Sequence, residues 1–539
     1  MTNLLKYFSK YGLLLLIPLI YWIVSFALHL NWGSFYQNTV DPEYTLIYNG
    51  VIVSTGSFAI NFIHHPATPT IFIAGLSSLI CRVFSAHSSF VQDFITEPEK
   101  YIHAAQLLQL SIIALFCFGF AKKLKDENVW KPSSWIVLLS LLSHQSLIEI
   151  SARFLPETTL IIPLFTIMVL IIRYIEFGEQ NHKQFLWQFP LWIGFAIACK
   201  IHFAPLILIP FVLLANSKKS FWLLSRNTFL AVLVFAYPLF TNLSASFTWF
   251  SNMASHTGKH GQGDSGIIST ENFSQHLSLL IEHHPVFWIL LILNVFLLVH
   301  LVTKTNLSAK ILKLRKSLFS VCLVFSIILA LVLKHFALHY FIPLYIWIGI
   351  LIYFPSYYLS SQWKSIQKKV MIALTAFVVI LILFNIQESR QVYEERQVLL
   401  KERNEIKTNI DQIVPQGAAL IVNAPHWGTP FPAYAHSFGF MHTYKRKTYF
   451  KQALKQAYPH FYLQVGWMPE YNHWDEFISL EEILKKEKKV FFYNQLETAE
   501  PRKLQNQIEA LKAKGINIVF QKLWQSDQKV ELYQLSLIS

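Results

Sequence analysis

Two carboxylates stand close together near the N-terminal end of the chain. Asp41 and Glu43 are separated by Pro42 and followed by Tyr44, shortly after an apolar run that ends at Leu30. Such a pair of acids can bind a cation, or one of them can serve as a general base. Carboxylate pairs are also common in solvated turns, so the spacing alone leaves both interpretations open.

Ionisable side chains recur at the ends of apolar runs further along the chain. They are Arg153, Glu157, Lys200, His202, Lys334, His335 and His339, and an earlier pair, His64 and His65, precedes the Pro66–Pro69 turn. A charged side chain at a helix centre costs about 2.5–3.5 kcal/mol on membrane-insertion scales, and less near the interface. Several cations on one membrane face suit a phosphate or pyrophosphate group. This pattern predicts a cation-lined cavity of a transferase.

A glycine-rich segment, HTGKHGQGDSG at 256–266, carries one more cation, Lys259. Glycine lets a backbone approach a ligand closely, and functional residues are often found on loops. Lys259 is therefore a candidate substrate-binding residue, and a solvated flexible loop is the alternative.

The elements that position these residues are apolar runs of membrane-spanning length. Hydrophobic residues make up 53% of the 539 residues and charged residues 14%, which excludes an ordinary water-soluble domain. A bilayer needs about 20 apolar residues per helix, and we expect about eleven transmembrane helices. They are expected at residues 11–30, 101–121, 134–151, 157–175, 188–200, 203–216, 220–240, 286–302, 317–333, 337–358 and 370–386.

Basic residues in alternate short loops predict which side of the membrane each loop faces. They predict a multi-pass protein of the cell (inner) membrane, with the N-terminus in the cytoplasm and residues 388–539, called the tail below, outside. This requires residues 188–216 to cross as two short segments interrupted around Lys200 and His202, and Thr70–Phe84 to lie along the interface. The net charge of +14 then belongs mostly to cytoplasmic loops beside anionic lipid, which disfavours nucleic acid as a partner.

Cofactor chemistry receives little support from the sequence. The four cysteines are Cys81, Cys117, Cys199 and Cys322, scattered through apolar segments without a CxxC pair. Neither a zinc site nor a disulfide framework is therefore predicted. No cofactor is assigned, and a divalent cation beside the two acids is the one candidate.

The composition changes after Asn385, where a charged helical run, Glu388 to Asp411, begins. Strand-like and helix-like pieces then alternate along the chain. Strands are expected at Ala418–Asn423, Val490–Tyr493, Ile516–Gln521 and Val530–Leu535, with helices at 446–456, 480–488 and 501–514. The predicted fold is an all-α polytopic membrane domain, residues 1–387, with interfacial helices in its first outer loop. A small extracytoplasmic α/β domain with a leading helix, residues 388–539, follows it.

The order of these motifs resembles the integral-membrane glycosyltransferases of the GT-C fold, the class of the protein O-mannosyltransferases and lipid A aminoarabinose transferases. DPEYTLIYNG, from Asp41 to Gly50, fits the acidic motif of that family's first outer loop. HHPATP at 64–69 and the following apolar run are similar to its peripheral helix. ARFLPE at 152–157, CKIH at 199–202 and LKHFALHYFIP at 333–343 are similar to its later elements.

The resemblance implies transfer of a sugar from a polyprenyl-phosphate donor to a lipid, glycan or protein acceptor on the extracytoplasmic face, with inversion at the anomeric carbon. Asp41 takes the position of the catalytic base and Glu43 is the second acid. Lys334, Lys200 and Arg153 are expected to neutralise the donor phosphate. The remaining candidates for substrate binding are His65, Glu157, Lys259, His339 and Tyr340. Pro42 separates the two acids, which departs from the family's acidic-pair members and puts their metal dependence in doubt here.

Three other functions remain open on the sequence. A transporter or flippase of lipid-linked sugars should carry its polar groups near the midplane, whereas here they gather toward one face. A polysaccharide polymerase or ligase of another membrane fold should lack interfacial helices after the first span. A non-catalytic assembly protein should depend on its tail rather than on Asp41.

Overall fold

The protein is described by a computed structural model, in which two compact units account for the whole chain. The structure describes residues 2–37, 42–58, 60, 67–85, 89–130, 132–256, 272–363, 367–424, 428–443, 447–464, 470–487, 489–495, 502–526 and 530–537. Unit 1 comprises residues 1–29, 62–73 and 106–391, and unit 2 comprises residues 30–61, 74–105 and 392–539. The segment predicted to be the first outer loop, residues 31–100, is called the first outer loop below; except for residues 62–73 it is grouped with the tail.

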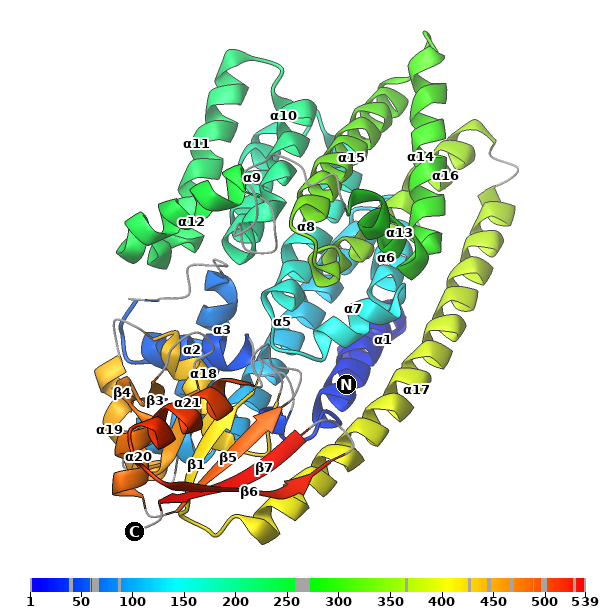
Figure 1. Ribbon diagram of the computed structural model, residues 1–539. Helices are drawn as coiled ribbons and strands as arrows, with labels where there is room; N and C mark the ends of the chain where they lie inside the picture. The colour runs from blue at the N-terminus through cyan, green and yellow to red at the C-terminus, as the bar shows by residue number, and fades with distance from the viewer. Residues whose placement is uncertain are drawn as a thin grey trace. The chain divides into compact units, whose positions relative to one another are not determined.

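Unit 1 is built from helices (Figure 1). Most residues of the predicted spans are helical, with breaks such as that at Lys200. The α-helices of unit 1 are α1 (Thr2–Leu30), α5 (Pro98–Asp126), α6 (Ser133–Leu139), α7 (Gln145–Ser151), α8 (Pro156–Phe177), α9 (His182–Cys199), α10 (Leu208–Leu214), α11 (Lys218–Phe235), α12 (Leu243–Ser255), α13 (Phe273–His283), α14 (Pro285–Thr303), α15 (Ala309–Lys334), α16 (Ile348–Gln362) and α17 (Gln367–Ile413). Short 3-10 turns, η2 (Ser140–Leu142), η3 (Ile201–Ile207), η4 (Tyr237–Asn242), η5 (Leu338–Tyr340) and η6 (Ile342–Trp347), join some of them. Helices α1, α5 and α17 continue into residues of unit 2.

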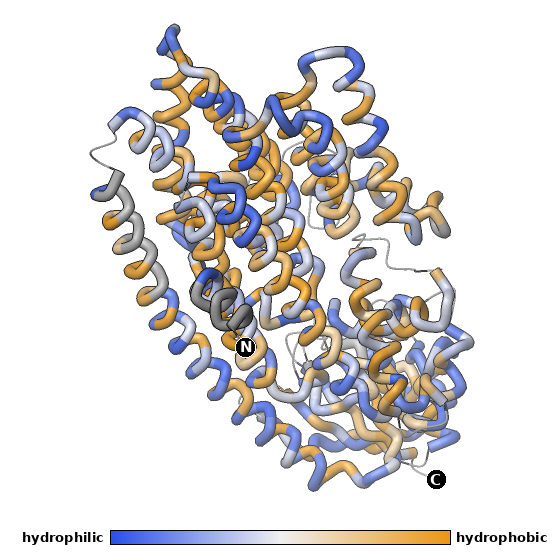
Figure 2. The backbone as a smooth tube through the Cα atoms, turned by 180° about the vertical axis from the view of Figure 1, so that it is seen from behind, coloured by the Kyte–Doolittle hydropathy of each residue, from blue (hydrophilic) through white to orange (hydrophobic). Residues whose placement is uncertain are grey.

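Five of these helical stretches are long and apolar enough to cross a membrane, or six if the bent pair α6–α7 is one span, among the residues described. The chain is therefore a membrane protein. Hydrophobic positions follow the helices of unit 1 along most of their length, and hydrophilic positions gather in the loops that join them (Figure 2). The count of about eleven spans and the predicted orientation stay predictions.

The helices of unit 1 differ in how much of their apolar surface is covered by protein. In α8, 89% of the most apolar window is buried, whereas in α14 only 22% is buried. Large apolar faces of this kind are costly in water, so the open face of α14 is a surface for lipid. Helix α8 is the centre of unit 1, where the Trp347 indole donates to the Leu164 carbonyl and Thr159 bonds Thr70.

Unit 2 contains a seven-stranded sheet in the order β4-β3-β2-β1-β5-β7-β6 (Figure 1). The strands are β1 (Ala419–Asn423), β2 (Phe461–Gln464), β3 (Tyr471–His473), β4 (Glu476–Ile478), β5 (Lys489–Gln495), β6 (Ile518–Gln525) and β7 (Val530–Leu537). β1 is parallel to β2 and β5, and the other neighbours are antiparallel. Every residue of β1 is buried, as expected for the centre of a parallel sheet covered on both faces.

Helices from both parts of unit 2 accompany this sheet. They are η1 (Phe35–Gln37), α2 (Glu43–Ser54), α3 (Thr68–Val83, shared with unit 1), α4 (Phe90–Thr96), α18 (Pro432–Met441), α19 (Lys447–Ala457), α20 (Leu480–Lys486) and α21 (Arg502–Ala513). α20 and α21 share one hydrophobic core with the sheet through residues such as Ile483, Ile508 and Phe492. The four predicted strands and three predicted helices of the tail are confirmed, whereas β2, β3, β4 and α18 were not predicted. α3 has 16 residues, fewer than a span needs, and its interfacial placement stays a prediction.

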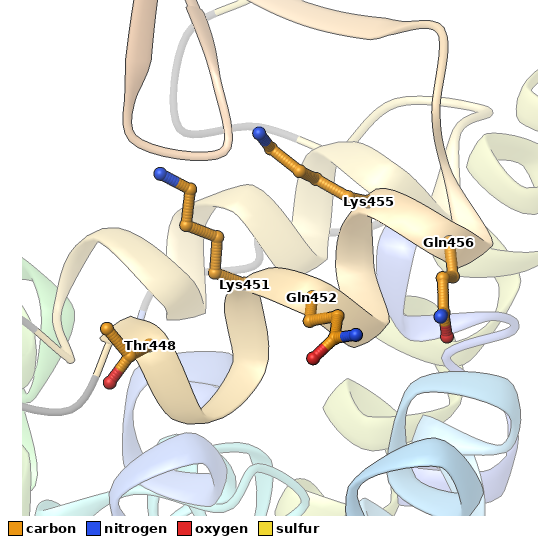
Figure 3. Close-up of a pocket in the computed structure, with 5 residues that line it drawn as sticks. All are labelled: Thr448, Lys451, Gln452, Lys455 and Gln456. Atoms are coloured by element: carbon orange, nitrogen blue, oxygen red, sulfur yellow. The ribbon is translucent and has the colours of Figure 1, made fainter.

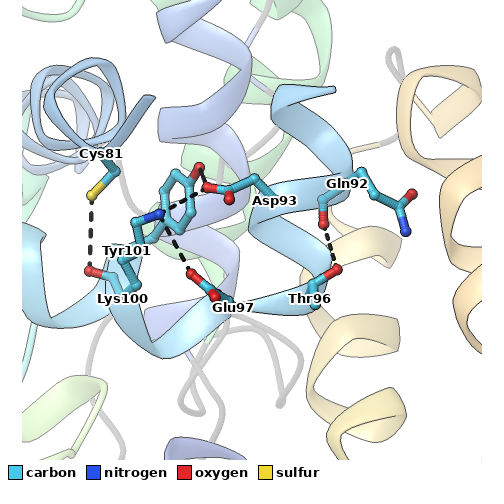
Figure 4. A network of polar contacts seen from close by, with 7 residues as sticks. All are labelled: Cys81, Gln92, Asp93, Thr96, Glu97, Lys100 and Tyr101. Atoms are coloured by element: carbon cyan, nitrogen blue, oxygen red, sulfur yellow. Dashed lines mark hydrogen bonds and ion pairs between the residues drawn. The ribbon is translucent and has the colours of Figure 1, made fainter. Parts of the chain in front are cut away.

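A buried carboxylate holds α4 against the start of α5 (Figure 4). Asp93 Oδ2 accepts hydrogen bonds from the Tyr101 hydroxyl at 2.6 Å and from Lys100 Nζ at 3.2 Å, and Lys100 also pairs with Glu97 at 3.4 Å. Burial by itself raises the pKa of the Asp93 carboxyl, but these hydrogen bonds outweigh it and leave the pKa below its usual value. Asp93 is therefore an ionised structural group of the first outer loop.

The close contact of α9 with α11 leads to a first prediction. A Cβ on Gly194 would lie 2.5 Å from Ala231 Cβ and 2.7 Å from the Ala231 carbonyl carbon, so backbone would have to move. Small residues allow this approach between membrane helices. We expect Gly194→Ala to destabilise the protein by about 1–3 kcal/mol, measured as a lower thermal unfolding midpoint in detergent.

Gly119→Ala is the matched control, because nothing lies within 4 Å of a Cβ at that position of α5. Its midpoint should equal or slightly exceed that of the wild type, since alanine favours helix. Equal midpoints for the two variants would contradict the close packing of α9 and α11.

Candidate functional site

Glu157 lies in the first turn of α8, deep inside unit 1. Pro156 begins the helix after Leu155, which is extended, and the side chain of Glu157 is only 3% exposed. Proline suits the first position of a helix, and the helix N-terminus favours a carboxylate. The turn that leads to Glu157 is held by Thr158, whose hydroxyl donates to the Arg153 carbonyl at 3.0 Å.

Lys200 forms an ion pair with Glu157 from a break between two helices. α9 ends at Cys199, Lys200 itself is extended (φ −152°, ψ 125°), and η3 begins at Ile201. The ammonium group bonds Glu157 Oε1, and the Lys200 side chain is 3% exposed. The interruption predicted around Lys200 is therefore present.

A third break brings Tyr340 and His339 to the same place. Both belong to η5, which follows the end of α15. Lys200 Nζ lies 4.0 Å from the centroid of the Tyr340 ring, and His339 Nε2 lies 3.7 Å from Glu157 Oε1. His202 Nε2 lies 3.3 Å from the Tyr340 carbonyl oxygen, to which it can donate. These five residues, Glu157, Lys200, His202, His339 and Tyr340, are called the ion-pair cluster below.

The ion-pair cluster is largely buried, with an accessible edge at His339. Glu157 and Lys200 are buried, but the His339 side chain is 44% exposed. A buried pair is stabilised only when its geometry and additional contacts offset the loss of water, and here the Tyr340 ring supplies a cation–π contact. Chemically, the cluster pairs the Lys200 ammonium group with the Glu157 carboxylate, so these two charges offset each other, and it leaves an imidazole at an accessible edge.

The other predicted cations lie elsewhere or outside the described residues. Lys334 Nζ donates to the Ala254 carbonyl at 2.7 Å, and His335 Nε2 lies 2.9 Å from the Met253 carbonyl. Both carbonyls belong to the last turn of α12, where a cation complements the helix dipole. Asp41, His64, His65 and Lys259 lie outside the described residues. Glu43 is in the first turn of α2, 2% exposed, in unit 2.

A second polar cluster in unit 1 was not predicted. His144, between η2 and α7, accepts from the Ser146 amide through Nδ1 at 3.0 Å, so its Nε2 carries the proton donated to His284 Nδ1. The His284 and Tyr345 rings lie 3.5 Å apart. His284 Nε2 and the Tyr345 hydroxyl are buried without a partner among the residues described. A histidine at a helix break within an apolar run is the signal that would have indicated it.

A metal site finds no support among the residues that the structure describes, where no group of three or more His, Cys, Asp or Glu side chains could hold an ion. Since Asp41 is not among them, the predicted divalent cation remains untested.

The tail has a crevice of about 380 Å³ along α19 (Figure 3), with two lysines at its edge. Lys451 and Lys455 Nζ lie 3.2 and 2.5 Å from the same Glu476 oxygen. Their hydrogen bonds, that of Lys455 first, lower the pKa of Glu476 to about 2. This carboxylate offsets the charge of the lysines, so the crevice is not a strong anion site.

Comparison with known proteins finds two similar solved structures and no match in sequence. No family model and no curated protein matches the chain in sequence. In structure, the chain is similar to ArnT from Cupriavidus metallidurans bound to undecaprenyl phosphate, with 12% identity, a TM-score of 0.48 and 98% of each chain covered. The apo state of that ArnT is similar with 11% identity, a TM-score of 0.47 and 97% of each chain covered. ArnT is an aminoarabinose transferase of the GT-C class, one of the families that the sequence resembles. No residue role in this chain follows from a likeness of this size.

The buried ion pair leads to a second prediction. Lys200→Met leaves the Glu157 carboxylate without its counter-charge, so we expect a loss of about 3–5 kcal/mol of stability. The double variant Lys200→Met with Glu157→Met removes both charges and should be more stable than Lys200→Met alone. Thermal unfolding in detergent measures both effects.

Lys334→Met is the matched control for the change from lysine to methionine. It removes a hydrogen bond to a carbonyl and leaves no charge unpaired, so its cost should be about 1–3 kcal/mol. Glu157→Met alone completes the set of variants. If the losses of Lys200→Met and Glu157→Met simply added in the double variant, the ion pair would not exist in the folded protein.

Proposed function

We propose that this chain is a membrane glycosyltransferase, which transfers a sugar from a polyprenyl-phosphate donor to an acceptor on the extracytoplasmic face. The single observation that carries the proposal is the ion-pair cluster. A buried acid and base inside an apolar helical unit are costly, and residues of this kind in membrane proteins usually mark a functional site. Here the residues of the cluster come from three places where the helices are interrupted: the start of α8, the break at Lys200 and η5. The chain therefore departs from regular helix where the charges meet.

The chemistry of the cluster suits a phosphate group at a lipid headgroup. Lys200 can neutralise a phosphate oxygen, and His339 lies at the accessible edge to add a second hydrogen bond. Glu157 holds the ammonium group in place, which makes it a positioning residue in this proposal. Cations aimed at the departing phosphate stabilise the charge that develops as the sugar leaves.

The base in the proposed reaction is Asp41. Its carboxylate takes the proton of the acceptor hydroxyl while the oxygen forms a bond to the anomeric carbon from the face opposite the phosphate. The bond between that carbon and the phosphate oxygen breaks, and polyprenyl phosphate leaves with the electron pair. The configuration at the anomeric carbon is inverted. The basis for Asp41 is the resemblance of DPEYTLIYNG to the acidic motif of GT-C enzymes.

The third prediction tests this assignment. Asp41→Asn keeps the size of the side chain and removes the base, so we expect sugar transfer to fall by about 10²–10⁴-fold. Transfer is measured by mass spectrometry of the acceptor, with purified protein and defined polyprenyl-phosphate sugars. Membrane abundance and the thermal midpoint should match the wild type.

Glu43→Gln is the comparison variant two residues away. A much larger loss for Asp41→Asn than for Glu43→Gln identifies Asp41 as the base. Retained transfer by Asp41→Asn would remove Asp41 from the mechanism. Movement of the lipid-linked sugar across a vesicle membrane without any new glycosidic bond would instead identify a transporter.

A further inference from the structure

A helix of the tail lies in close contact with the helix that follows Asp41 in the chain. Within unit 2, α18 packs on α2, and a Cβ on Gly439 would lie 2.4 Å from Tyr48 Cδ2 and 3.1 Å from the Tyr44 carbonyl oxygen. Only glycine fits this contact without movement of its neighbours. The contact joins parts of the chain that are far apart in sequence, because Tyr48 and His436 are separated by 388 positions.

His436 joins α18 to two different parts of the first outer loop. Its Nε2 lies 3.1 Å from the Ile95 carbonyl oxygen, which only accepts, so Nε2 carries the proton. Its Nδ1 therefore accepts from the Tyr48 hydroxyl, at 2.9 Å. The side chain is fully buried, and burial lowers the pKa of His436 to about 4, which keeps the imidazole neutral in the tautomer that both bonds require.

Aromatic rings fill the space around this histidine. The Tyr48 ring lies 4.9 Å from that of Phe94 on α4 and 4.7 Å from that of Phe450 on α19, and the Tyr44 ring lies 5.8 Å from the His436 ring. Buried aromatic pairs add stability beyond their area. α2 is thus held by α18 and α19 of the tail as well as by its own loop.

The segment before Asp41 is held in the same way. The extension of α17 into unit 2 places Arg396 4.0 Å from the Trp32 ring centroid and Asn404 3.2 Å from Gln37. In the tail, the Thr429 amide donates to the Tyr36 carbonyl at 2.8 Å. The two described stretches on either side of Asp41 therefore both contact residues after 391.

We propose that the tail and the extension of α17 fix the position of α2 and of residues 32–37, and that His436 and Gly439 are positioning residues for the reaction. This rests on the proposed function, in which Asp41 is the base. Asp41 is joined to α2 through Pro42 alone, and successive Cα atoms are about 3.8 Å apart, so the position of α2 limits where Asp41 can lie. A misplacement of about 1 Å can cost about 10²-fold in rate.

The fourth prediction concerns the full-length protein with Gly439→Ala and, separately, with His436→Phe. The first crowds the Tyr48 ring, and the second keeps a ring while it removes both hydrogen bonds. We expect kcat for sugar transfer to fall by about 10–10²-fold, with the KM for the donor changed by less than about twofold, because the donor-phosphate residues are in unit 1. Gly119→Ala, which meets no atom, should retain the wild-type kcat.

A double variant tests the contact itself. Tyr48→Leu removes the ring that an alanine at 439 would meet, so adding Gly439→Ala to Tyr48→Leu should cost much less than Gly439→Ala costs alone. If Gly439→Ala does not fold, His436→Phe decides the question. Wild-type kcat in both Gly439→Ala and His436→Phe would overturn the proposal.

Hydrogen exchange separates this proposal from the proposed function. Amides of residues 43–54 should exchange faster in Gly439→Ala and His436→Phe than in the wild type, whether or not the protein transfers sugar. Faster exchange in a protein with no transferase activity would reject the proposed function and leave the fixing of α2 intact. Unchanged exchange of these amides in both variants would reject the fixing of α2, even in an active transferase.

Discussion

The membrane unit depends on one interaction above the others, the buried ion pair between Glu157 and Lys200. Each charge that is moved out of water loses several kcal/mol of hydration free energy. The attraction between the two charges offsets this loss only at close range and with further contacts. The chain meets that condition by ending α9 at Cys199 and starting α8 one residue before the acid. A regular helix through Lys200 would not supply the same extended backbone at that residue. The ion pair is thus formed at the break, where the extended Lys200 bonds Glu157.

A comparable constraint operates in the other unit, where close packing replaces charge. Residues 30–61 and 74–105 form one compact unit with residues 392–539. Gly439 and His436 make this possible, one by leaving room for the Tyr48 ring and the other by bonding two elements of the first outer loop. Contacts between such distant parts of a chain form late and depend on both partners being folded. A tail with this role is part of the structure around α2, whatever else it binds.

The sequence predicts those elements best that have a strong local pattern. Long apolar runs predicted the helices of unit 1, and short apolar, strand-like segments between helical pieces predicted β1, β5, β6 and β7. α18 was missed because its residues, PAYAHSFGFM, are buried on all sides and show no polar face. β2, β3 and β4 are three or four residues long, too short for a period to be recognised. The ion pair itself was predicted only as a set of cations and acids on one face, because sequence does not show which partners meet.

Lys334 and Lys200 show why that distinction needs coordinates. Each follows an apolar run and each is a lysine near the end of a helix, and the sequence ranked Lys334 ahead of Lys200 as a donor-phosphate residue. In the structure Lys334 neutralises the carbonyl end of α12, a role that any cation near a helix C-terminus can fill. Lys200 instead has a carboxylate partner, an aromatic ring beneath its ammonium group and a half-exposed histidine beside the same carboxylate. In the proposed function, an anion at His339 would meet an ammonium group that Glu157 already holds in place, without the entropy cost of ordering a free lysine side chain.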